Sequence, residues 1–264
     1  MAFTRSEIFS RALVLRSQGR IYDLSDLSLD DVFHGSVDRF VEIAYRLQGR
    51  IRVLDVGAGH GMLVAFLSAL GHHCHAVDYE NMSERFPLAY KADRHSQTSP
   101  PINFKVCNIE IDPLPFDDMV FDAVVCCQVL EHFTHSHLHA IREIYRVLVP
   151  SGLIEIDVPN AASFRNRSRI LRGRNITYDY AQHYLYATPV LYKNLSFYPI
   201  RHNREFTRDE LILLLHETGF HKVEVRFLKS RRWRNGLSRL KSIGTAIKDL
   251  IPSFRKTLIG WGEK

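Results

Sequence analysis

Residues 53–61 read Val-Leu-Asp-Val-Gly-Ala-Gly-His-Gly, and this segment decides the fold. It begins in the apolar run of residues 51–56, which is typical of a short buried strand. Three glycines then allow the backbone to turn sharply and to come close to a ligand. A helix predicted over residues 62–70 follows directly, and the N-terminus of such a helix favours polar or anionic groups. The segment therefore predicts a ligand-binding bend between the first strand and its helix.

The position of the glycines distinguishes between two classes of nucleotide cofactor. A dinucleotide-binding loop needs glycine or alanine where this chain has Met62, because strand and helix pack closely there. Asp55 is also out of place in such a loop, since it precedes the first glycine and can hydrogen-bond the loop amides or an ammonium group. After the next predicted strand, Asp78 can accept both hydroxyls of a ribose and Tyr79 can pack on an adenine ring. This arrangement argues against NAD and favours S-adenosylmethionine.

Strands and helices alternate along the first 160 residues. Periodicity and capping residues predict strands at residues 51–56, 73–77, 103–108, 121–127, 153–158, 222–228 and 257–260, and helices at residues 5–18, 36–48, 62–70, 137–148, 207–216 and 236–250. Ser36 is the predicted cap of the second helix, and residues 150–152 form a predicted turn. The alternation predicts an α/β fold with a mostly parallel sheet and helices on both faces.

Composition limits the architecture further. The chain has 264 residues, of which 45% are hydrophobic, so one elaborated domain is expected. We divide it into N-terminal helices (1–49), a cofactor-binding core (50–160), an acceptor-site insert (160–205) and a C-terminal half (206–264). No apolar run is long enough to span a membrane, and the first residues lack the apolar centre of a signal peptide, so we expect a cytoplasmic protein with reduced, buried cysteines.

Several motifs in a fixed order resemble those of class I S-adenosylmethionine-dependent methyltransferases. Residues 55–61 resemble the family's acid-x-Gly-x-Gly-x-Gly motif, and Asp78 matches its ribose-binding acid. Val129-Leu-Glu-His132 matches the sequence VLEH, and residues 146–152 (RVLVPSG) are similar to RVLKPGG. The resemblance covers residues 50–160 and returns over 205–220. It implies an enzyme with a Rossmann-like seven-stranded sheet, mostly parallel with an antiparallel last strand, and S-adenosylmethionine as cofactor.

The same resemblance assigns the cofactor-binding residues. They are Asp55, Gly57, Ala58, Gly59, Gly61, Asp78, Tyr79, Asn108, Ile109 and Gln128. The family usually has aspartate where this chain has Asn108, a residue that contacts the adenine amino group. An amide oxygen can still accept that hydrogen bond, so cofactor binding is expected.

His132 is the candidate catalytic residue. It follows the fourth strand at the carboxyl edge of the sheet, where open α/β sheets bind ligands, and histidine suits deprotonation of a hydroxyl acceptor near neutral pH. The alternative is that it shapes the loop or contacts the cofactor. His132, His135, His137 and His139 also form a dense histidine cluster, but no cysteine or acid completes a tidy ligand set, so we expect no metal.

The insert at residues 160–205 is the expected acceptor site. It is rich in aromatic and basic residues, which suit a sugar ring, a phosphate or a nucleotide, and His183, Tyr184 and His202 are its predicted substrate contacts. The alternative is a lid that packs its tyrosines on the core. The stretch 159–174 resembles methyltransferases of surface-glycan and lipid-linked sugar biosynthesis. That resemblance implies O-methylation of a glycan, a lipid-linked sugar or another small molecule.

The net charge is +6, and the excess of basic residues is not evenly spread along the chain. Basic residues are dense at 222–241, and apolar residues recur at helical spacing over 233–251. Residues 229–256 could therefore lie on an anionic membrane at its inner face, or simply pack on the domain. A degenerate, non-catalytic fold that binds a membrane or polyanion is the alternative function. Nucleic-acid methylation is less expected, because no RNA-binding motif is present and Asp157-Val-Pro-Asn160 is not the amino-methylating signature.

Overall fold

A seven-stranded sheet forms the centre of the molecule in a computed structural model that describes residues 2–86, 102–177, 179–229 and 250–264. Its strands are β1 (Arg52–Val56), β2 (His73–Asp78), β3 (Asn103–Val106), β4 (Phe121–Cys127), β5 (Leu148–Pro159), β8 (His221–Phe227) and β9 (Thr257–Glu263). They lie in the order β3-β2-β1-β4-β5-β9-β8. Neighbouring strands from β3 to β5 are parallel, whereas β9 is antiparallel to both β5 and β8. The predicted sheet, with its antiparallel last strand, is confirmed.

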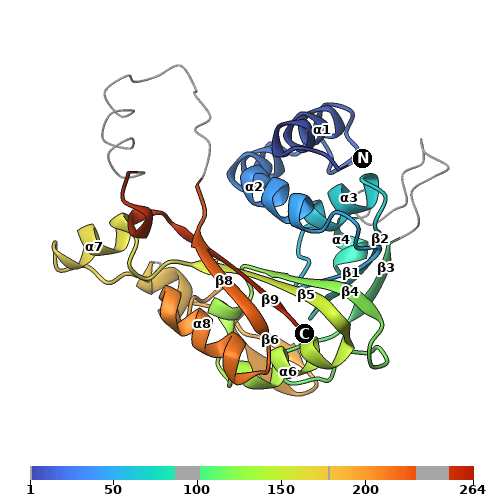
Figure 1. Cartoon of the computed structure of the whole chain (residues 1–264). Helices are drawn as coiled ribbons and strands as arrows, with labels where there is room; N and C mark the ends of the chain where they lie inside the picture. Colours follow the sequence, from blue (N-terminus) through green and yellow to red (C-terminus); the bar gives the residue numbers. More distant parts are fainter. Residues whose placement is uncertain (1, 87–101, 178, 230–249) are drawn as a thin grey trace, which may run out of the picture.

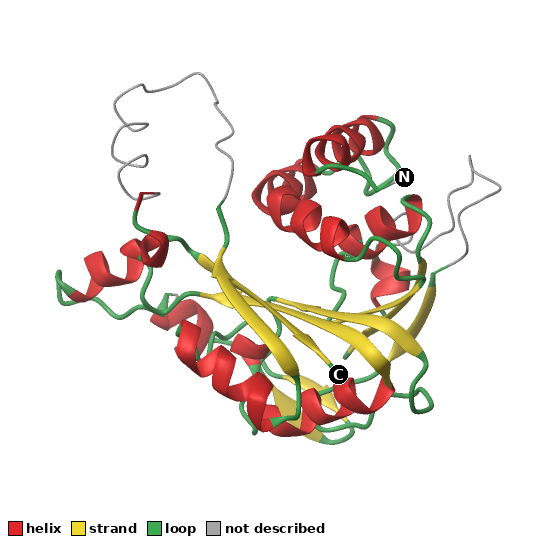
Figure 2. Cartoon of the chain, viewed as in Figure 1, coloured by secondary structure: helices red, strands yellow, loops and turns green. Residues whose placement is uncertain are grey.

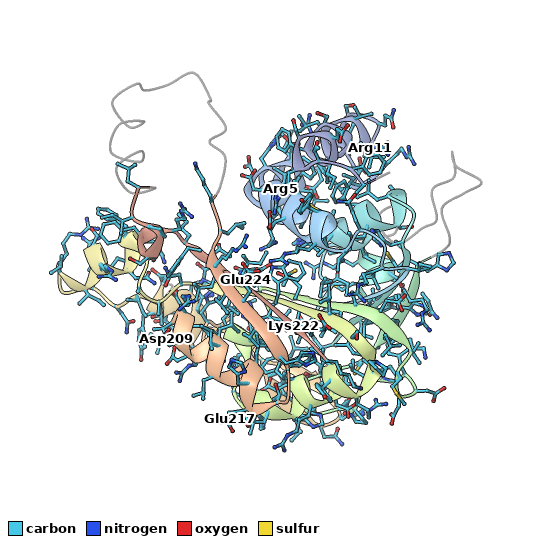
Figure 3. All side chains as sticks on the ribbon, in the orientation of Figure 1. Arg5, Arg11, Asp209, Glu217, Lys222 and Glu224 are labelled. Atoms are coloured by element: carbon cyan, nitrogen blue, oxygen red, sulfur yellow. The ribbon has the colours of Figure 1, made fainter. Side chains whose placement is uncertain are left out.

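Helices cover both faces of this sheet, as predicted (Figures 1 and 2). One face carries α1 (Arg5–Ser17), α2 (Leu27–Arg46) and α3 (Met62–Ala69), and the other carries α6 (His137–Val147) and α8 (Arg208–Glu217). Alternate residues of β1 supply the two cores: Val53 packs with the first group of helices, and Leu54 and Val56 pack with the second. Charged side chains such as Arg11 on α1 and Glu217 on α8 point outward (Figure 3).

The order of the strands creates a crevice at one edge of the sheet. From β1 the chain proceeds outward through β2 and β3, and it then returns to the other side of β1 to form β4 and β5. The loops after β1 and β4 therefore leave the carboxyl edge of the sheet in opposite directions. Open α/β sheets bind ligands at such a switch point.

Two predicted boundaries differ most from the structure. The second helix begins at Leu27 rather than at residue 36, because Asp26 caps it by accepting hydrogen bonds from Ser28 N and Leu29 N, and Ser36 lies inside the helix. The fifth strand begins at Leu148, since it pairs with β4 both before and after the predicted turn at residues 150–152, which the sheet accommodates as an irregularity. The capping box of Thr207 and Glu210 on α8 is present as predicted.

The insert contains more structure than its sequence indicates. It forms α7 (Phe164–Ile170), the short helix η2 (Ala181–Leu185) and a hairpin of β6 (Val190–Tyr192) and β7 (Leu195–Phe197). Three shorter helices are α4 (Met82–Arg85), η1 (Leu130–His132) and η3 (Pro252–Phe254). All four cysteines are free thiols. No helix among the described residues is long and apolar enough to cross a membrane. Most of the helix predicted over 236–250 lies outside the described residues.

Candidate functional site

The glycine bend after β1 brings two loops into close contact. Gly57, Gly59 and Gly61 have φ angles of 70°, 51° and 73°, a conformation that residues with a side chain rarely adopt. A Cβ atom on Gly57 would lie 2.3 Å from Cγ2 of Val129, which belongs to the loop after β4. Glycine is therefore required at position 57 both by the backbone angle and by the neighbouring loop.

Asp78 ends β2 and is tied to this bend. Its Oδ2 accepts a hydrogen bond from Gly59 N at 2.8 Å, and its Oδ1 accepts one from Tyr79 N at 2.8 Å. Burial raises the pKa of the Asp78 carboxyl to about 6, although these two amides oppose the shift. The predicted proximity of the ribose-binding acid to the glycines is thus present in the structure.

Asp55 lies on β1, beneath the bend. It is 2% exposed, and its Oδ2 has no hydrogen-bond partner. Burial, followed by repulsion from Asp78, raises the pKa of the Asp55 carboxyl to about 7, and the guanidinium of Arg39 opposes the shift. Since buried polar atoms in folded proteins nearly always have a partner, this oxygen points to a ligand that donates a hydrogen bond or carries positive charge.

Two adjoining hollows meet at the bend. The first has a volume of about 340 Å³, and its lining includes Asp78, Tyr79, Asn108, Ile109 and His132. The second has a volume of about 260 Å³, and its lining includes Arg39, Asp55 and Ala58. Gly57, Gly59, His60 and Gln128 line both hollows. The structure therefore brings every predicted cofactor residue except Gly61 to one or both hollows, and Gly61 caps α3 directly beside them.

The hairpin of the insert closes one side of the first hollow, which the sequence did not predict. Phe197, Tyr198 and Pro199 contribute to its lining. The hairpin is held there by Tyr192, whose hydroxyl contacts a carboxylate oxygen of Asp112 and accepts a hydrogen bond from Asn108 N at 3.3 Å. The side-chain oxygen of Asn108 in turn accepts a hydrogen bond from Glu110 N at 3.1 Å.

The turn after β4 forms the opposite wall. Gln128 has a φ of 55°, and its Nε2 donates a hydrogen bond to Asp157 Oδ1 at 2.6 Å. Arg39 contacts the same oxygen at 3.2 Å, so the turn is linked to α2 and β5. The sequence did not predict the position of Arg39, because 118 residues separate it from Asp157.

His132 lines the first hollow, and its tautomer is fixed by the insert. The ring atom Nδ1 lies 2.8 Å from the carbonyl oxygen of Arg201. A carbonyl can only accept, so Nδ1 carries the hydrogen and Nε2 keeps its lone pair. Burial lowers the pKa of His132, against the effect of this hydrogen bond. The ring is therefore neutral at pH 7.

The three predicted substrate residues do not line either hollow. His202 is buried against His132, with ring centroids 4.8 Å apart. The hydroxyl of Tyr184 donates a hydrogen bond to the backbone oxygen of His202 at 2.5 Å, and His183 is half-buried nearby in the sequence. Phe197, Tyr198 and Pro199 of the insert line the first hollow instead.

The fold and the site now permit comparison with known proteins. A family model described as a methyltransferase domain matches residues 31–225, which is most of the chain. The chain belongs to this methyltransferase family. The expected S-adenosylmethionine is thereby confirmed as the cofactor of the domain.

Three curated relatives are all named as methyltransferases, but their named reactions differ. The chain is 32% identical over 115 residues to the mitochondrial ubiquinone biosynthesis O-methyltransferase of Mus musculus, which covers 42% of this chain and 29% of that protein. It is 29% identical over 171 residues to a protein of Mycobacterium tuberculosis described as a probable S-adenosylmethionine-dependent methyltransferase. This match covers 65% of this chain and 49% of that protein. It is 31% identical over 141 residues to a ubiquinone/menaquinone biosynthesis C-methyltransferase of Ectopseudomonas oleovorans. This match covers 53% of this chain and 82% of that protein. The chain spans less than half of the length of the first two relatives.

Solved structures agree on the fold of the methyltransferase domain. The chain superimposes on S-adenosylmethionine-dependent methyltransferases from Archaeoglobus fulgidus (TM-score 0.52, 17% identity, 85% of this chain and 94% of that one) and Mesorhizobium loti (TM-score 0.53, 14% identity, 81% and 91%). At such low identity the likeness shows the fold alone.

The residues of this methyltransferase domain fit its cofactor. The Gly57 bend leaves no room for a side chain, as expected where the backbone approaches a ligand closely. The buried Asp55 oxygen without a partner suits the ammonium group of the cofactor's methionine moiety, and Asp78 suits its ribose. Tyr79 and Ile109 supply apolar surface for an adenine ring.

Proposed function

We propose that this domain transfers the methyl group of S-adenosylmethionine to a hydroxyl oxygen of its acceptor. The orientation of His132 is the observation that carries this proposal. Its Nδ1–H is held by Arg201 O, so the lone pair on Nε2 is available to a hydroxyl in the hollow. A neutral imidazole in that position has the properties of a general base.

Several residues of the chain have distinct roles in the proposed reaction. Bound S-adenosylmethionine supplies a methyl group on a sulfonium, which is a good leaving group. Asp78 and Asp55 hold the ribose and the ammonium group, and the bend at Gly57 allows close approach. His132 Nε2 takes the proton of the acceptor hydroxyl, which frees the oxygen to accept the methyl group that the cofactor would supply. Phe197, Tyr198 and Pro199 exclude water from the hollow. Alignment of the acceptor with the methyl group supplies much of the rate enhancement.

The acceptor that we propose is a glycan, a lipid-linked sugar or a comparable small molecule. The stretch 159–174 supports this by its similarity to methyltransferases that act on such compounds. Beside the hollow, the guanidinium of Arg201 lies 3.4 Å from the centroid of the Tyr198 ring, and an aromatic face with a cation suits a sugar that bears phosphate. The O-methyltransferase named among the relatives supports oxygen as the acceptor atom, and the C-methyltransferase makes carbon the alternative to test.

Two measurements test this function. Calorimetric titration with S-adenosylmethionine and its demethylated product tests the cofactor site, and labelled cofactor with nucleotide sugars and lipid-linked glycans tests the acceptor. His132→Ala should lower kcat by about 10²- to 10⁴-fold, the usual contribution of a general base, while cofactor affinity changes little. His139→Ala, at an exposed position on α6, is the matched control and should keep full activity.

Equal kcat in wild type and His132→Ala would remove His132 as the base. Tight cofactor binding without transfer to any acceptor would instead favour the non-catalytic fold. Transfer to a carbon atom, identified from the product, would replace O-methylation by C-methylation.

A further inference from the structure

Glu131 is a buried carboxyl group for which the proposed reaction gives no role. It lies in the turn after β4 and is 0% exposed. Neither of its carboxylate oxygens has a hydrogen-bond partner among the described residues. Burying a carboxyl group without a partner costs several kcal/mol, about the scale measured for single unpaired ions, so such groups are normally paired or bound to a metal. The position therefore calls for a cationic ligand.

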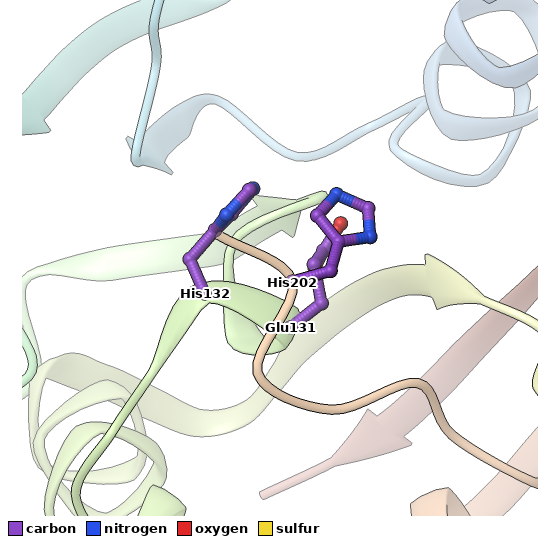
Figure 4. Close-up of side chains that lie close together, drawn as sticks. All are labelled: Glu131, His132 and His202. Carbon is purple, nitrogen blue, oxygen red and sulfur yellow. The ribbon is translucent and has the colours of Figure 1, made fainter. Parts of the chain in front are cut away.

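Two imidazole rings lie beside this carboxyl group (Figure 4). His132 follows Glu131 directly, and His202 comes from the end of the insert. One ligand atom from each of the three residues lies within 4.8 Å of the other two. Figure 4 shows the two rings on the same side of the turn as the carboxylate of Glu131.

The backbone holds this arrangement in place. Asn203 N and Arg204 N donate hydrogen bonds to Glu131 O at 2.8 and 3.2 Å, and the side chain of Asn203 donates one to His132 O at 2.7 Å. The hydrogen bond from His132 Nδ1 to Arg201 O joins the same two segments. The segment that carries His202 is thus fixed to the turn after β4, at a separation of about seventy residues in the sequence.

We propose that Glu131, His132 and His202 bind a divalent transition-metal cation of the zinc, cobalt or manganese type. Two imidazole nitrogens and one carboxylate oxygen are ligands that such ions accept, and three protein ligands leave further positions open, as in catalytic metal sites. The hydrogen bond from the distal nitrogen of His132 to a carbonyl is the usual support of a metal-binding histidine.

The dimensions and the charge of the site agree with this assignment. Ligands that bind one ion at about 2.0–2.2 Å lie at most about 4.4 Å apart, so the 4.8 Å limit requires only small side-chain rotations. The hydrogen bond of His132 Nδ1 to Arg201 O leaves the lone pair on Nε2 for a metal ion. Around Glu131, the charged neighbours are two acids, Asp157 and Glu205, and one cation, Arg39.

The other histidines near this turn already have partners within the chain. The side chains of His135, His137 and His139 contact Glu110, Leu130 O and Asp112 O, respectively, so the run of histidines in the sequence does not form a site. A second group, formed by Cys127, Glu155 and Asp157, includes the ion pair of Asp157 with Arg39. Such a pair already supplies the positive charge that a metal would bring.

The role of the ion rests on the proposed function, whereas its binding does not. His132 faces the hollow in which the acceptor hydroxyl is expected. An ion bound at its Nε2 would hold the acceptor oxygen at an open position and lower the pKa of that hydroxyl, which then loses its proton to water. In this form of the reaction the ion replaces His132 as the group that activates the acceptor.

Cobalt titration of the metal-free full chain tests the site directly. Chelator-treated protein titrated with Co²⁺ should develop visible absorption bands of nitrogen-ligated cobalt at one ion per chain, and Zn²⁺ should displace them. Glu131→Gln and His202→Ala should each weaken Co²⁺ binding by more than about 10-fold, the loss seen even for outer-shell partners of metal sites. His73→Ala, an exposed histidine at the opposite end of β2, should bind Co²⁺ as the wild type does.

The outcomes separate this inference from the proposed function. Wild-type protein without cobalt bands overturns the metal site whatever the variants do, and so do bands that persist in both variants. Calorimetric binding of S-adenosylmethionine to each variant shows that its domain is folded and tests the cofactor site independently. Cofactor binding without cobalt binding would leave His132 as the base and refute the ion alone.

Discussion

Gly57 and Val129 are in contact at the bend after β1, and this contact leaves no space for a single methyl group. Gly57→Ala places a Cβ atom where Val129 lies and imposes a φ of 70° on alanine. We expect it to lower the free energy of unfolding by about 1–3 kcal/mol, the cost of a strained backbone position, and to abolish measurable cofactor binding. Urea denaturation and calorimetry check the two effects.

Gly35→Ala is the matched control for this change. Gly35 lies inside α2, its φ is not positive, and a Cβ atom there meets nothing within 4 Å. Alanine should stabilise the helix by up to about 1 kcal/mol and leave cofactor affinity unchanged. If both variants bind the cofactor normally, the close approach at Gly57 is not part of the site.

Asp78→Asn tests the ribose contact. The carboxylate offers charge-assisted acceptors to ribose hydroxyls, and hydrogen bonds to charged groups contribute about 1.5–3 kcal/mol. Cofactor affinity should therefore fall by about 10- to 100-fold in calorimetric titration. Asp209→Asn, at a position 92% exposed on α8, should change nothing. An unaltered affinity in Asp78→Asn would exclude this residue from the cofactor site.

Single residues of the candidate site could be predicted where their position depends on their neighbours in the sequence. The glycine bend, Asp55 and Asp78 could be predicted because each follows directly from a strand end. Arg39 and Phe197 could not, since they reach the site from distant parts of the chain. The same limit explains why the sequence predicted a cluster of neighbouring histidines, whereas folding brings His202 to Glu131.

The hairpin of β6 and β7 is joined to the edge of the first hollow by the hydroxyl of Tyr192 and by the ion pair of Lys193 with Asp112. Tyr192→Phe removes the contacts with Asp112 and Asn108 N but keeps the ring. Cofactor affinity should fall by about 3- to 10-fold, equivalent to one hydrogen bond of about 1 kcal/mol, with little loss of global stability. Tyr186→Phe, on an exposed tyrosine, is the control. A change in unfolding free energy without a change in affinity would contradict this role of the hairpin.

Most strands could be predicted at the scale of elements, because buried parallel strands read as short apolar runs. β4 matches its predicted bounds, and β1 and β2 differ from theirs by one residue. The start of α2 was missed because Asp26 supplies the cap in place of Ser36. The insert was not predicted in detail: its short helices and hairpin are stabilised by contacts with the turn after β4 and with Asn108, which local periodicity does not reveal.

Buried titratable groups make the stability of the whole molecule depend on pH. Burial raises the pKa of Asp55 to about 7 and that of Glu131 to about 8, above their unfolded values. Stability from such groups is complete below the unfolded pKa and is lost as pH rises through the folded pKa. Burial lowers the pKa of His72 and His137, and their contribution is lost as pH falls below about 6.5. Above about pH 6.5 only the loss from the carboxyl groups continues, so metal-free and cofactor-free protein should become less stable as pH rises from about 6.5 to 8.

Urea denaturation from pH 5 to pH 9 measures this pH dependence. Asp55→Asn removes one titrating group, so the fall in stability above pH 6 should become less steep by up to about 1.4 kcal/mol per pH unit. A free energy of unfolding that rises steadily from pH 6 to pH 9 would contradict the assignment of neutral, buried carboxyl groups.

Contact with a membrane is a separate prediction at the molecular scale. It concerns residues 229–256, of which 230–249 lie outside the described residues. Basic charge and helically spaced apolar residues predict binding to vesicles that contain anionic lipid, and the binding should weaken as salt is raised. Sedimentation with anionic and neutral vesicles at low salt is the measurement. Equal recovery in the supernatant with both kinds of vesicle would refute the prediction.

The position of β9 has a consequence for how the chain folds during synthesis. Its residues leave the ribosome after those of every other strand in the sheet, yet it lies between β5 and β8 and pairs with both along most of its length. Until it emerges, β5 presents a bare edge and β8 has no neighbour in the sheet. Because unpaired edges invite association with other chains, the nascent protein depends on a late insertion step, during which chaperones can shield it.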